Sequence, residues 1–222
     1  MTDPIARFRA WFRAASKAGA PIAEAMVLAT ADRRGRPSSR YVLLKEASER
    51  GFVFYTNAAS RKGREMAGNP YVSLVFYWHV TGRQVRIDGK VRVLSACEAD
   101  EYWQERPVGS RYASAASDQS RPIASRRELL RRYSKLQQQY PDGEIPRPAH
   151  WKGYLVVPDT IEFWTRAEPR LHRRERFTRV RTAGSASPTT GSKTRTAGSS
   201  SRTAWSKSRS ARSRWESEIL QP

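Results

Sequence analysis

The sequence predicts a mainly β protein of the α+β class, in which an antiparallel barrel carries helices on its outside. β-rich runs follow one another at close spacing with tight turns between them, and strands and helices do not alternate regularly. The chain also lacks Gly-x-Gly-x-x-Gly and Walker A sequences, which argues against Rossmann and P-loop nucleotide sites. A phosphate ligand would therefore be held by side chains.

The first half of the chain is expected to form one helix and then most of the strands. Apolar residues at helical spacing predict the helix, which Gly19 ends. The residues that create this spacing are Ile5, Phe8, Trp11, Phe12 and Ala15. Strands are expected over residues 25–31, 40–45, 51–56, 71–78 and 83–94.

Turn and cap residues separate these elements. Residues 32–37, Asp-Arg-Arg-Gly-Arg-Pro, have the chemistry of a hairpin turn. Ser60 can cap a short helix that runs through Met66, and Asp88-Gly89 suggests a bulge in the strand that contains it. The second half is expected to contain helices at about 96–105, 109–117 and 125–139, and then strands at 153–157, 160–165 and 176–179.

Composition restricts the class of protein and of partner. With 38% hydrophobic residues among 222, the chain can bury a sizeable core, and its single cysteine excludes an intrachain disulfide framework or a Cys-rich zinc site. A net charge of +20 favours anionic partners: nucleic acid, an acidic membrane surface or phosphorylated small molecules. No apolar run is long enough to span a membrane, and we expect a soluble, cytoplasmic protein.

One segment, residues 180–214, differs from the rest in composition. Of its 35 residues, 16 are Ser or Thr, eight are Lys or Arg, and none is acidic. We therefore expect a disordered insert in a domain made of residues 1–179 and 215–222. The insert is either a basic tether for nucleic acid or membrane, or an expansion with no role in the chemistry. Without it the remaining residues still carry a net charge of +12.

Three groups of residues could bind an anionic ligand. Residues 40–45 place positive charge at both ends of an apolar run, and Tyr55-Thr56 precedes Ser60-Arg61-Lys62 at a helix start. Hydroxyl, guanidinium, ammonium and backbone N–H groups there could converge on one phosphate. The alternative is that these are solvated charges at a sheet edge.

The other two groups are Tyr102, Arg106 and Ser110, and Trp164 with the basic run at 170–174. Tyr102 and Arg106 would share a helical face if the helix extends that far. His172 is the only histidine in the basic run. No cluster has the spacing of metal ligands, and no nucleophile–base pair stands out, so hydrolase and metalloenzyme functions have no support.

These residues also carry a family resemblance that covers about residues 4–179 and 215–222. The order and spacing of nine short motifs resemble those of pyridoxine/pyridoxamine 5′-phosphate oxidases. The motifs are Arg40-Tyr41-Val42-Leu43-Leu44-Lys45, Phe54-Tyr55-Thr56-Asn57, Ser60-Arg61-Lys62, Asn69-Pro70, Arg83-Gln84-Val85, Arg106-Pro107, Gln119-Ser120, Glu162-Phe163-Trp164 and Arg170-Leu171-His172. The ending from Trp215 to Pro222 resembles the Trp-x-x-x-x-Leu-x-Pro ending of the family.

The resemblance implies an FMN-binding split β-barrel that works as a homodimer with two FMN at the subunit interface. It implies oxidation of pyridoxamine or pyridoxine 5′-phosphate to pyridoxal 5′-phosphate by O2, giving H2O2, and NH3 from the amine. The residues that it places on FMN are Arg40, Tyr41, Val42, Leu43, Leu44, Lys45, Tyr55, Thr56, Arg61, Lys62, Gln84, Gln119, Ser120, Trp164 and Arg174. Those that it places on the substrate are Lys45, Tyr102, Arg106, Ser110, Arg170, Leu171 and His172, of which Arg170 and His172 are the candidate catalytic residues.

The sequence departs from the family pattern in three places. It opens close to the first core helix, without the amino-terminal arm common in the family; Arg173 stands where aspartate is usual; and the basic insert interrupts the last hairpin. A flavin-binding split barrel with another substrate, or with impaired catalysis, is therefore the alternative function. A nucleic-acid-binding protein is disfavoured, since the insert has one aromatic residue, Trp205.

Overall fold

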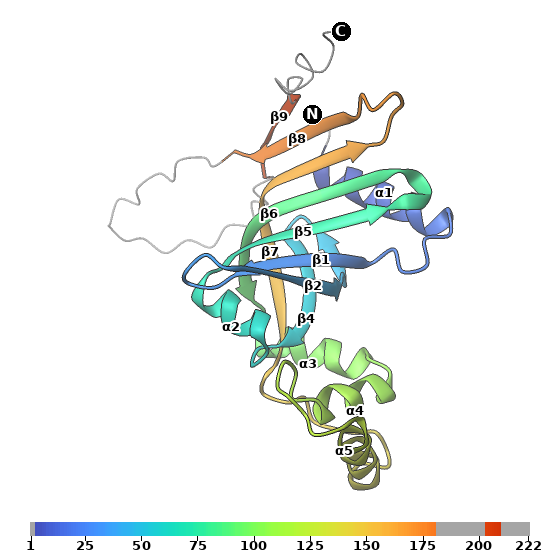
Figure 1. The fold of residues 1–222 in the computed structure, drawn as a ribbon, viewed down its shortest axis with the longest axis vertical. Helices are drawn as coiled ribbons and strands as arrows, with labels where there is room; N and C mark the ends of the chain where they lie inside the picture. Colours follow the sequence, from blue (N-terminus) through green and yellow to red (C-terminus); the bar gives the residue numbers. More distant parts are fainter. Residues whose placement is uncertain (1–2, 181–202, 210–222) are drawn as a thin grey trace, which may run out of the picture.

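The computed structural model describes residues 3–180 and 203–209, which form one curled sheet flanked by helices (Figure 1). The nine strands of these residues all pair antiparallel. Their bounds are β1 Ala25–Ala31, β2 Pro37–Leu43, β3 Glu46–Ser48, β4 Gly51–Asn57, β5 Tyr71–Trp78, β6 Arg83–Val93, β7 Trp151–Thr165, β8 Arg173–Arg179 and β9 Trp205–Arg209. The helices are α1 Pro4–Lys17, α2 Arg61–Gly68, α3 Ala96–Glu105, α4 Val108–Ala116 and α5 Arg126–Gln139, with a 3-10 turn, η1, at His79–Thr81.

The sheet is organised around its longest strand, β7. The strand order is β2-β1-β5-β6-β7-β4-β3, with β8 added to β7 and β9 to β8. One edge of β7 pairs with β6, while the other pairs first with β4 and then with β8. Because paired strands twist, a 15-residue strand shared in this way curls the sheet into a half-barrel. The expected antiparallel architecture is confirmed.

A bulge bends β6 against β7 where the sequence suggests it. The register shifts between Asp88 and Gly89, and Gly89 pairs with Pro158. A Cβ atom on Gly89 would lie 2.2 Å from the carbonyl oxygen of Val157, so the close approach of the strands requires glycine. The same irregularity explains why β7 runs unbroken through Pro158, where two separate strands were expected: proline is tolerated at a bulge.

The main core lies between the sheet and α1. The carboxylate of Asp3 caps this helix by accepting hydrogen bonds from the backbone N–H groups of Ile5 and Ala6. Phe8 is fully buried, with its ring centroid 4.9 Å from that of Phe52 and 5.0 Å from that of Phe76. The predicted amphipathic helix is thereby confirmed.

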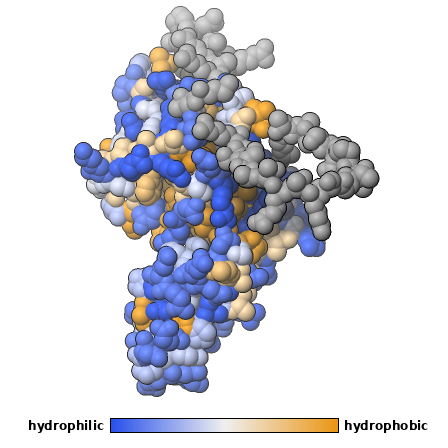
Figure 2. Space-filling model, turned by 180° about the vertical axis from the view of Figure 1, so that it is seen from behind, coloured by the Kyte–Doolittle hydropathy of each residue, from blue (hydrophilic) through white to orange (hydrophobic). Residues whose placement is uncertain are grey.

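The helices α3, α4 and α5 gather at one end of the sheet (Figure 1). They have a small core of their own, in which the indole N–H of Trp103 donates to the carbonyl oxygen of Ile145 at 2.8 Å. No residue of α5 is buried, and the outside of this end is mainly hydrophilic (Figure 2). Trp151 of β7 and Tyr55 of β4 belong to this small core, so it joins the helices to the barrel.

The predicted insert is not wholly without structure. Residues 205–209 form β9, which pairs with β8 from Glu175 to Arg179, so the expectation of disorder across 180–214 is wrong there. Trp205 packs against the main core, which explains why a polar segment can add a strand. Residues 181–202 and 210–214 of the insert lie outside the described residues, as does the tail 215–222.

A buried carboxylate ties α1, β8 and β9 together. Glu175 is 2% exposed and lies 2.9 Å from Arg7, 3.1 Å from Arg173 and in contact with Lys207. The hydrogen bond from Arg7 is the main cause that lowers the pKa of Glu175 to about 2. Arg173, the residue that departs from the family pattern, is thus used in this ionic cluster. Because side chains alternate along a strand, Arg174 projects from the other face of β8.

Candidate functional site

A cavity of about 990 Å³ opens between β2, β4, the start of α2 and the helices α3 and α4. It brings together most of the residues predicted to bind a ligand from motifs far apart in the sequence. Those on the cofactor side of the prediction are Arg40, Tyr41, Val42, Leu43, Lys45, Tyr55, Thr56, Arg61, Lys62, Gln119 and Ser120. Those on the substrate side are Lys45, Tyr102, Arg106 and Ser110.

The start of α2 places a buried ammonium group at the cavity wall. Ser60 is the N-cap and accepts a hydrogen bond from the backbone N–H of Gly63. Lys62, only 6% exposed, donates to Thr56 Oγ1 at 3.1 Å, to Ser60 Oγ at 3.2 Å and to Gln119 Oε1 at 2.9 Å. These acceptors are all uncharged. Burial therefore lowers the pKa of Lys62 to about 8, with the charge of Arg40 as a second cause.

Two guanidinium groups stand beside this lysine, on either side of one carboxylate. Glu65 of α2 is buried and forms ion pairs with Arg40 of β2 at 3.4 Å and with Arg61 at 2.8 Å. Burial lowers the pKa of Arg40, and the charge of Glu65 opposes this shift. With Lys62, these arginines give this part of the cavity a concentrated positive charge suited to a phosphate.

Aromatic rings form the wall between α3 and β4. Tyr55 stacks on Tyr102 with 4.2 Å between ring centroids and on Trp151 with 4.9 Å. Burial is the main cause that raises the pKa of Tyr55 to about 12, so its hydroxyl stays protonated and can donate. Lys45 lies with its Nζ atom 6.0 Å from the Tyr102 ring. The wall thus presents both flat apolar surface and hydrogen-bond donors.

Arg106 is a second, half-buried cation of the cavity. Its guanidinium lies 4.8 Å from the Trp151 ring and 5.1 Å from the Trp103 ring, and Nη2 donates to Ser114 Oγ at 3.0 Å. Within the described residues, its buried Nη1 atom has no hydrogen-bond partner. Burial lowers the pKa of Arg106. This buried donor, on a residue that lines the cavity, is available to an acceptor such as an anionic ligand.

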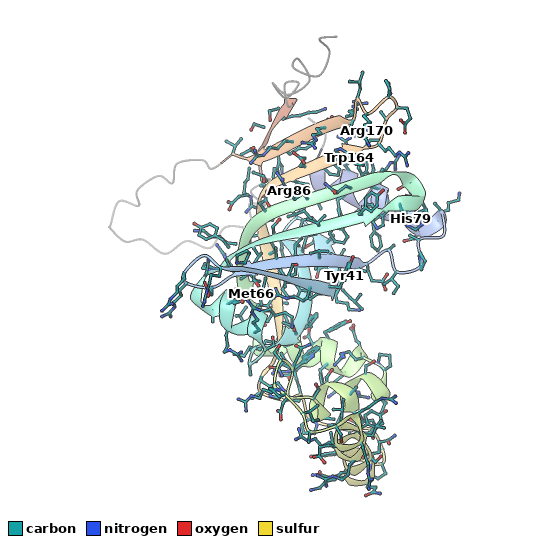
Figure 3. All side chains as sticks on the ribbon, in the orientation of Figure 1. Tyr41, Met66, His79, Arg86, Trp164 and Arg170 are labelled. Atoms are coloured by element: carbon teal, nitrogen blue, oxygen red, sulfur yellow. The ribbon has the colours of Figure 1, made fainter. Side chains whose placement is uncertain are left out.

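A second group of predicted residues does not line this cavity. Gln84, Trp164 and Arg174 lie in register across β6, β7 and β8, and the His172 ring is 4.6 Å from the Trp164 ring. Figure 3 shows Trp164 and Arg170 near the turn between β7 and β8, away from Tyr41 on β2. Leu171, also in this turn, is exposed. The two groups therefore occupy different places in one chain.

The β7–β8 turn holds its residues in a defined conformation. Arg170 has a positive φ of 80°, as does Ser120 at 68° in the cavity, and such backbone costs a non-glycine residue about 1 kcal/mol or more. The His172 N–H donates to the carbonyl oxygen of Arg170, and His172 Nδ1 accepts from the N–H of Ala167. The neutral imidazole then carries its proton on Nε2, where it can donate to a ligand.

Some site residues were missed in the sequence. Trp151, Ser114 and Glu65 were not expected there. Trp151 and Glu65 depend on contacts with residues far away in the sequence, whereas Ser114 contacts Arg106, eight residues earlier. The only local signal was that Glu65 follows Arg61 by four residues in a helix. Conversely, the side chain of Leu44 is buried in the core and does not line the cavity. In the described part of the chain, no three His, Cys, Asp or Glu side chains are grouped to hold a metal ion.

Comparison with known proteins identifies matching families over nearly the whole chain. A family model described as "Pyridoxamine 5'-phosphate oxidase" matches residues 12–140, and one described as "Pyridoxine 5'-phosphate oxidase C-terminal dimerisation region" matches residues 151–222. Two similar proteins, both named "Pyridoxine/pyridoxamine 5'-phosphate oxidase", come from Paraburkholderia phytofirmans and Novosphingobium aromaticivorans. The first is 51% identical over 80% of this chain and 83% of its own length; the second is 50% identical over 79% and 86%.

Solved structures show the same fold. PhzG from Burkholderia lata, in complex with tetrahydrophenazine-1-carboxylic acid, matches with a TM-score of 0.78 and 30% identity over 94% of this chain and 93% of that one. An FMN-binding protein from Nostoc punctiforme, related to pyridoxamine 5'-phosphate oxidase, matches with a TM-score of 0.69 over 94% and 98% of the two chains. At 18% identity, the second match supports the fold alone.

Proposed function

Because the chain belongs to the pyridoxine/pyridoxamine 5′-phosphate oxidase family, we propose that it converts pyridoxamine and pyridoxine 5′-phosphates to pyridoxal 5′-phosphate, using FMN. O2 is the electron acceptor and yields H2O2, and the amine substrate also yields NH3. The observation that carries the proposal is that one cavity holds two cationic groups, one around the buried Lys62 and one around the half-buried Arg106. Cofactor and substrate each carry one phosphate monoester, so two such groups are needed.

The residues around Lys62 fit the phosphate of FMN. Lys62 is a buried cation whose protein acceptors are all neutral, and Arg61 and Arg40 stand beside it. Gln119 and Thr56 complete a set of polar groups suited to phosphate and ribityl oxygens. When bound, FMN supplies the electron acceptor of the oxidation and passes the electrons on to O2.

The residues around Arg106 fit the substrate. Arg106 Nη1 is an unused donor among the described residues, and Ser110, Tyr102 and Lys45 line the same cavity. These groups would bind the substrate phosphate, while the stacked rings of the wall exclude water from one side of the cavity. The protein thereby orients the substrate and leaves the redox chemistry to the cofactor.

We further propose that each site is completed by a second copy of the chain. The C-terminal match to a dimerisation region supports a homodimer, and His172, Arg170, Trp164 and Arg174 lie outside the cavity of their own chain. In a two-fold dimer, one chain can present this group to the cavity of the other. His172 Nε2–H and Arg170 would then donate to substituents of the substrate ring.

Mixed dimers test this arrangement. The assay uses a substrate concentration near the wild-type KM, at which Arg106→Ala and His172→Ala chains are each expected to have little activity alone. When refolded together in equal amounts, they are expected to show about a quarter of wild-type activity, since half the dimers then have one intact site of two. Refolded wild-type protein is the control for recovery. If both groups acted within one chain, no mixture would contain an intact site, and the absence of any recovered activity would contradict the proposal.

A second candidate function is oxidation of a different, unphosphorylated substrate. It is favoured by the similarity to PhzG, whose structure contains a tricyclic carboxylic acid. Arg106, which lines the cavity with Ser110 and Lys45, argues for a phosphate ligand instead, although one arginine could also bind a carboxylate. The substrate test below decides between the two.

Anaerobic mixing of FMN-loaded protein with pyridoxine 5′-phosphate tests the reaction directly. We expect the visible flavin absorbance to bleach, to return when air is admitted, and pyridoxal 5′-phosphate to form in the same amount as the flavin that was bleached. Pyridoxine without its phosphate is the matched control and should bleach the flavin far more slowly. Bound flavin that stays oxidised with both phosphorylated vitamers would contradict the proposed reaction and leave the second candidate.

A further inference from the structure

Among the described residues, no acidic side chain lines the cavity, and Glu65 lies behind its wall, where it pairs with the lining residues Arg40 and Arg61. It lies in the last part of α2, which packs under the β1–β2 hairpin (Figure 1). The side chain of Met66, next to it, is labelled in Figure 3 and is buried in the main core. Glu65 is thus fixed from behind by the barrel while its carboxylate faces two arginines.

The carboxylate of Glu65 uses both oxygens. Oε1 accepts from Arg61 Nε at 2.8 Å. Oε2 accepts from Thr30 Oγ1 at 2.5 Å, from Ser38 Oγ at 2.6 Å and from Arg40 Nη2 at 3.4 Å. Burial alone would raise the pKa of Glu65, but the hydrogen bonds from Ser38, Thr30 and Arg61 lower it to about 2. The group therefore remains a carboxylate at neutral pH.

These contacts hold each arginine differently. Arg40 is held at four points, since its Nη1 also donates to Leu28 and Thr30 and its Nη2 to Ser38. Arg61 is held only through Nε, and in the described part of the chain no hydrogen bond occupies its two terminal nitrogens. A guanidinium oriented through Nε keeps both Nη groups for bidentate contact with an oxyanion.

We infer that Glu65 is a positioning residue for the cofactor phosphate, an inference that rests on the proposed function. It orients Arg61 and Arg40 before the cofactor arrives and sets the charge of the site. Arg40, Arg61 and Lys62 carry three positive charges and Glu65 carries one negative charge, which leaves a balance of two. A phosphate monoester dianion matches that balance.

The sharpest test uses two flavins that differ only in the phosphate. Glutamine at position 65 keeps the size of the side chain, but its NH2 group must face a hydrogen-bond donor of either Arg61 or Arg40. For the apoprotein, Glu65→Gln is expected to raise the Kd for FMN by about 10- to 100-fold and to change the Kd for riboflavin by less than about threefold. Flavin fluorescence quenching measures both constants.

Two further variants separate positioning from folding. Glu98→Gln is the matched control, because Glu98 also pairs with an arginine, Arg50 at 2.6 Å, but at a partly exposed helix start outside the cavity. It should leave both constants unchanged. Glu65→Asp keeps the charge and should recover part of the FMN affinity lost in Glu65→Gln.

The outcomes distinguish this inference from the function on which it rests. Wild-type protein that binds FMN no more tightly than riboflavin would overturn the proposed cofactor site itself. If the wild type prefers FMN but Glu65→Gln weakens both flavins equally, or neither, the positioning role is overturned and the cofactor site stands. Circular dichroism of each apoprotein shows whether an equal loss comes from unfolding.

Discussion

Replacing Arg106 with alanine is expected to raise the KM for pyridoxine 5′-phosphate by about 30- to 1000-fold, while FMN remains bound. Arg106 is held between Trp103 and Trp151, and its Nη2 already has a partner in Ser114. The remaining buried donor, Nη1, has none among the described residues. Loss of charge-assisted hydrogen bonds to a phosphate costs about 2–4 kcal/mol, which gives this range.

Steady-state kinetics with two substrates isolates the phosphate contact. The ratio of kcat/KM between phosphorylated and unphosphorylated pyridoxine should fall in Arg106→Ala, because only the phosphorylated substrate loses an interaction. Arg106→Lys keeps the charge but lacks the planar guanidinium, so its ratio of kcat/KM should lie between those of the wild type and Arg106→Ala. Arg50→Ala, which removes a surface arginine outside the cavity, is the control. An unchanged KM in Arg106→Ala would show that the substrate phosphate binds elsewhere.

The part of the site that could be predicted from the sequence is the part that is local. Ser60, Arg61 and Lys62 stand together because a cap residue begins α2 directly after β4, and this order can be read from the chain. Tyr102 lies in α3, and Pro107 ends the helix region as expected. The helix stops at Glu105, so Arg106 is an extended C-cap and does not share a helical face with Tyr102. Roles in binding FMN or substrate came from the family resemblance and not from these patterns.

The part that could not be predicted depends on packing between distant segments. Trp151 reaches the cavity only because β7 pairs with β4, which brings its ring to Tyr55. Glu65 of α2 contacts Arg40 and Ser38 of β2, from which it is separated in the chain by β3 and β4. No periodicity in a single stretch of sequence encodes such contacts.

The C-terminal region also contains an element that composition could not predict. Composition predicts disorder for all of 180–214, yet β9 forms where Trp205 packs on the core and Lys207 meets Glu175. Five residues are too few to shift the average composition of a 35-residue segment. A strand of this kind is stabilised by the edge it pairs with, β8, and not by its own propensity.

The affinity for FMN is expected to fall by about tenfold per pH unit as the pH rises above about 8, because Lys62 loses its proton there. Burial lowers the pKa of Lys62 from 10.5 to about 8 in the protein without ligand. A bound phosphate dianion stabilises the ammonium and raises that pKa again. At a pH between the pKa of Lys62 in the free protein and its pKa in the FMN complex, FMN binding requires uptake of a proton, so rising pH weakens binding. Riboflavin, which lacks the phosphate, should show no such dependence.

The same group affects folding with the opposite sign. Because the pKa of Lys62 is lower in the folded protein than in the unfolded chain, the unfolded chain binds the extra proton between about pH 8 and 10.5. This lysine therefore makes the apoprotein more stable as pH rises through that window, whereas FMN binds more weakly. Thermal melts with and without FMN across the window measure both trends.

Two substitutions of Lys62 separate its charge from its titration. Lys62→Met removes the ammonium group and is expected to weaken FMN binding by about 100-fold at pH 7. It is also expected to stabilise the apoprotein, because the buried ammonium of Lys62 has only neutral acceptors and no carboxylate partner. Lys62→Arg keeps a charge that does not titrate in this range and should abolish the pH dependence above 8. If the Arg variant kept the wild-type pH profile, the titrating group would lie elsewhere, and the buried lysine would not be the one that receives the phosphate.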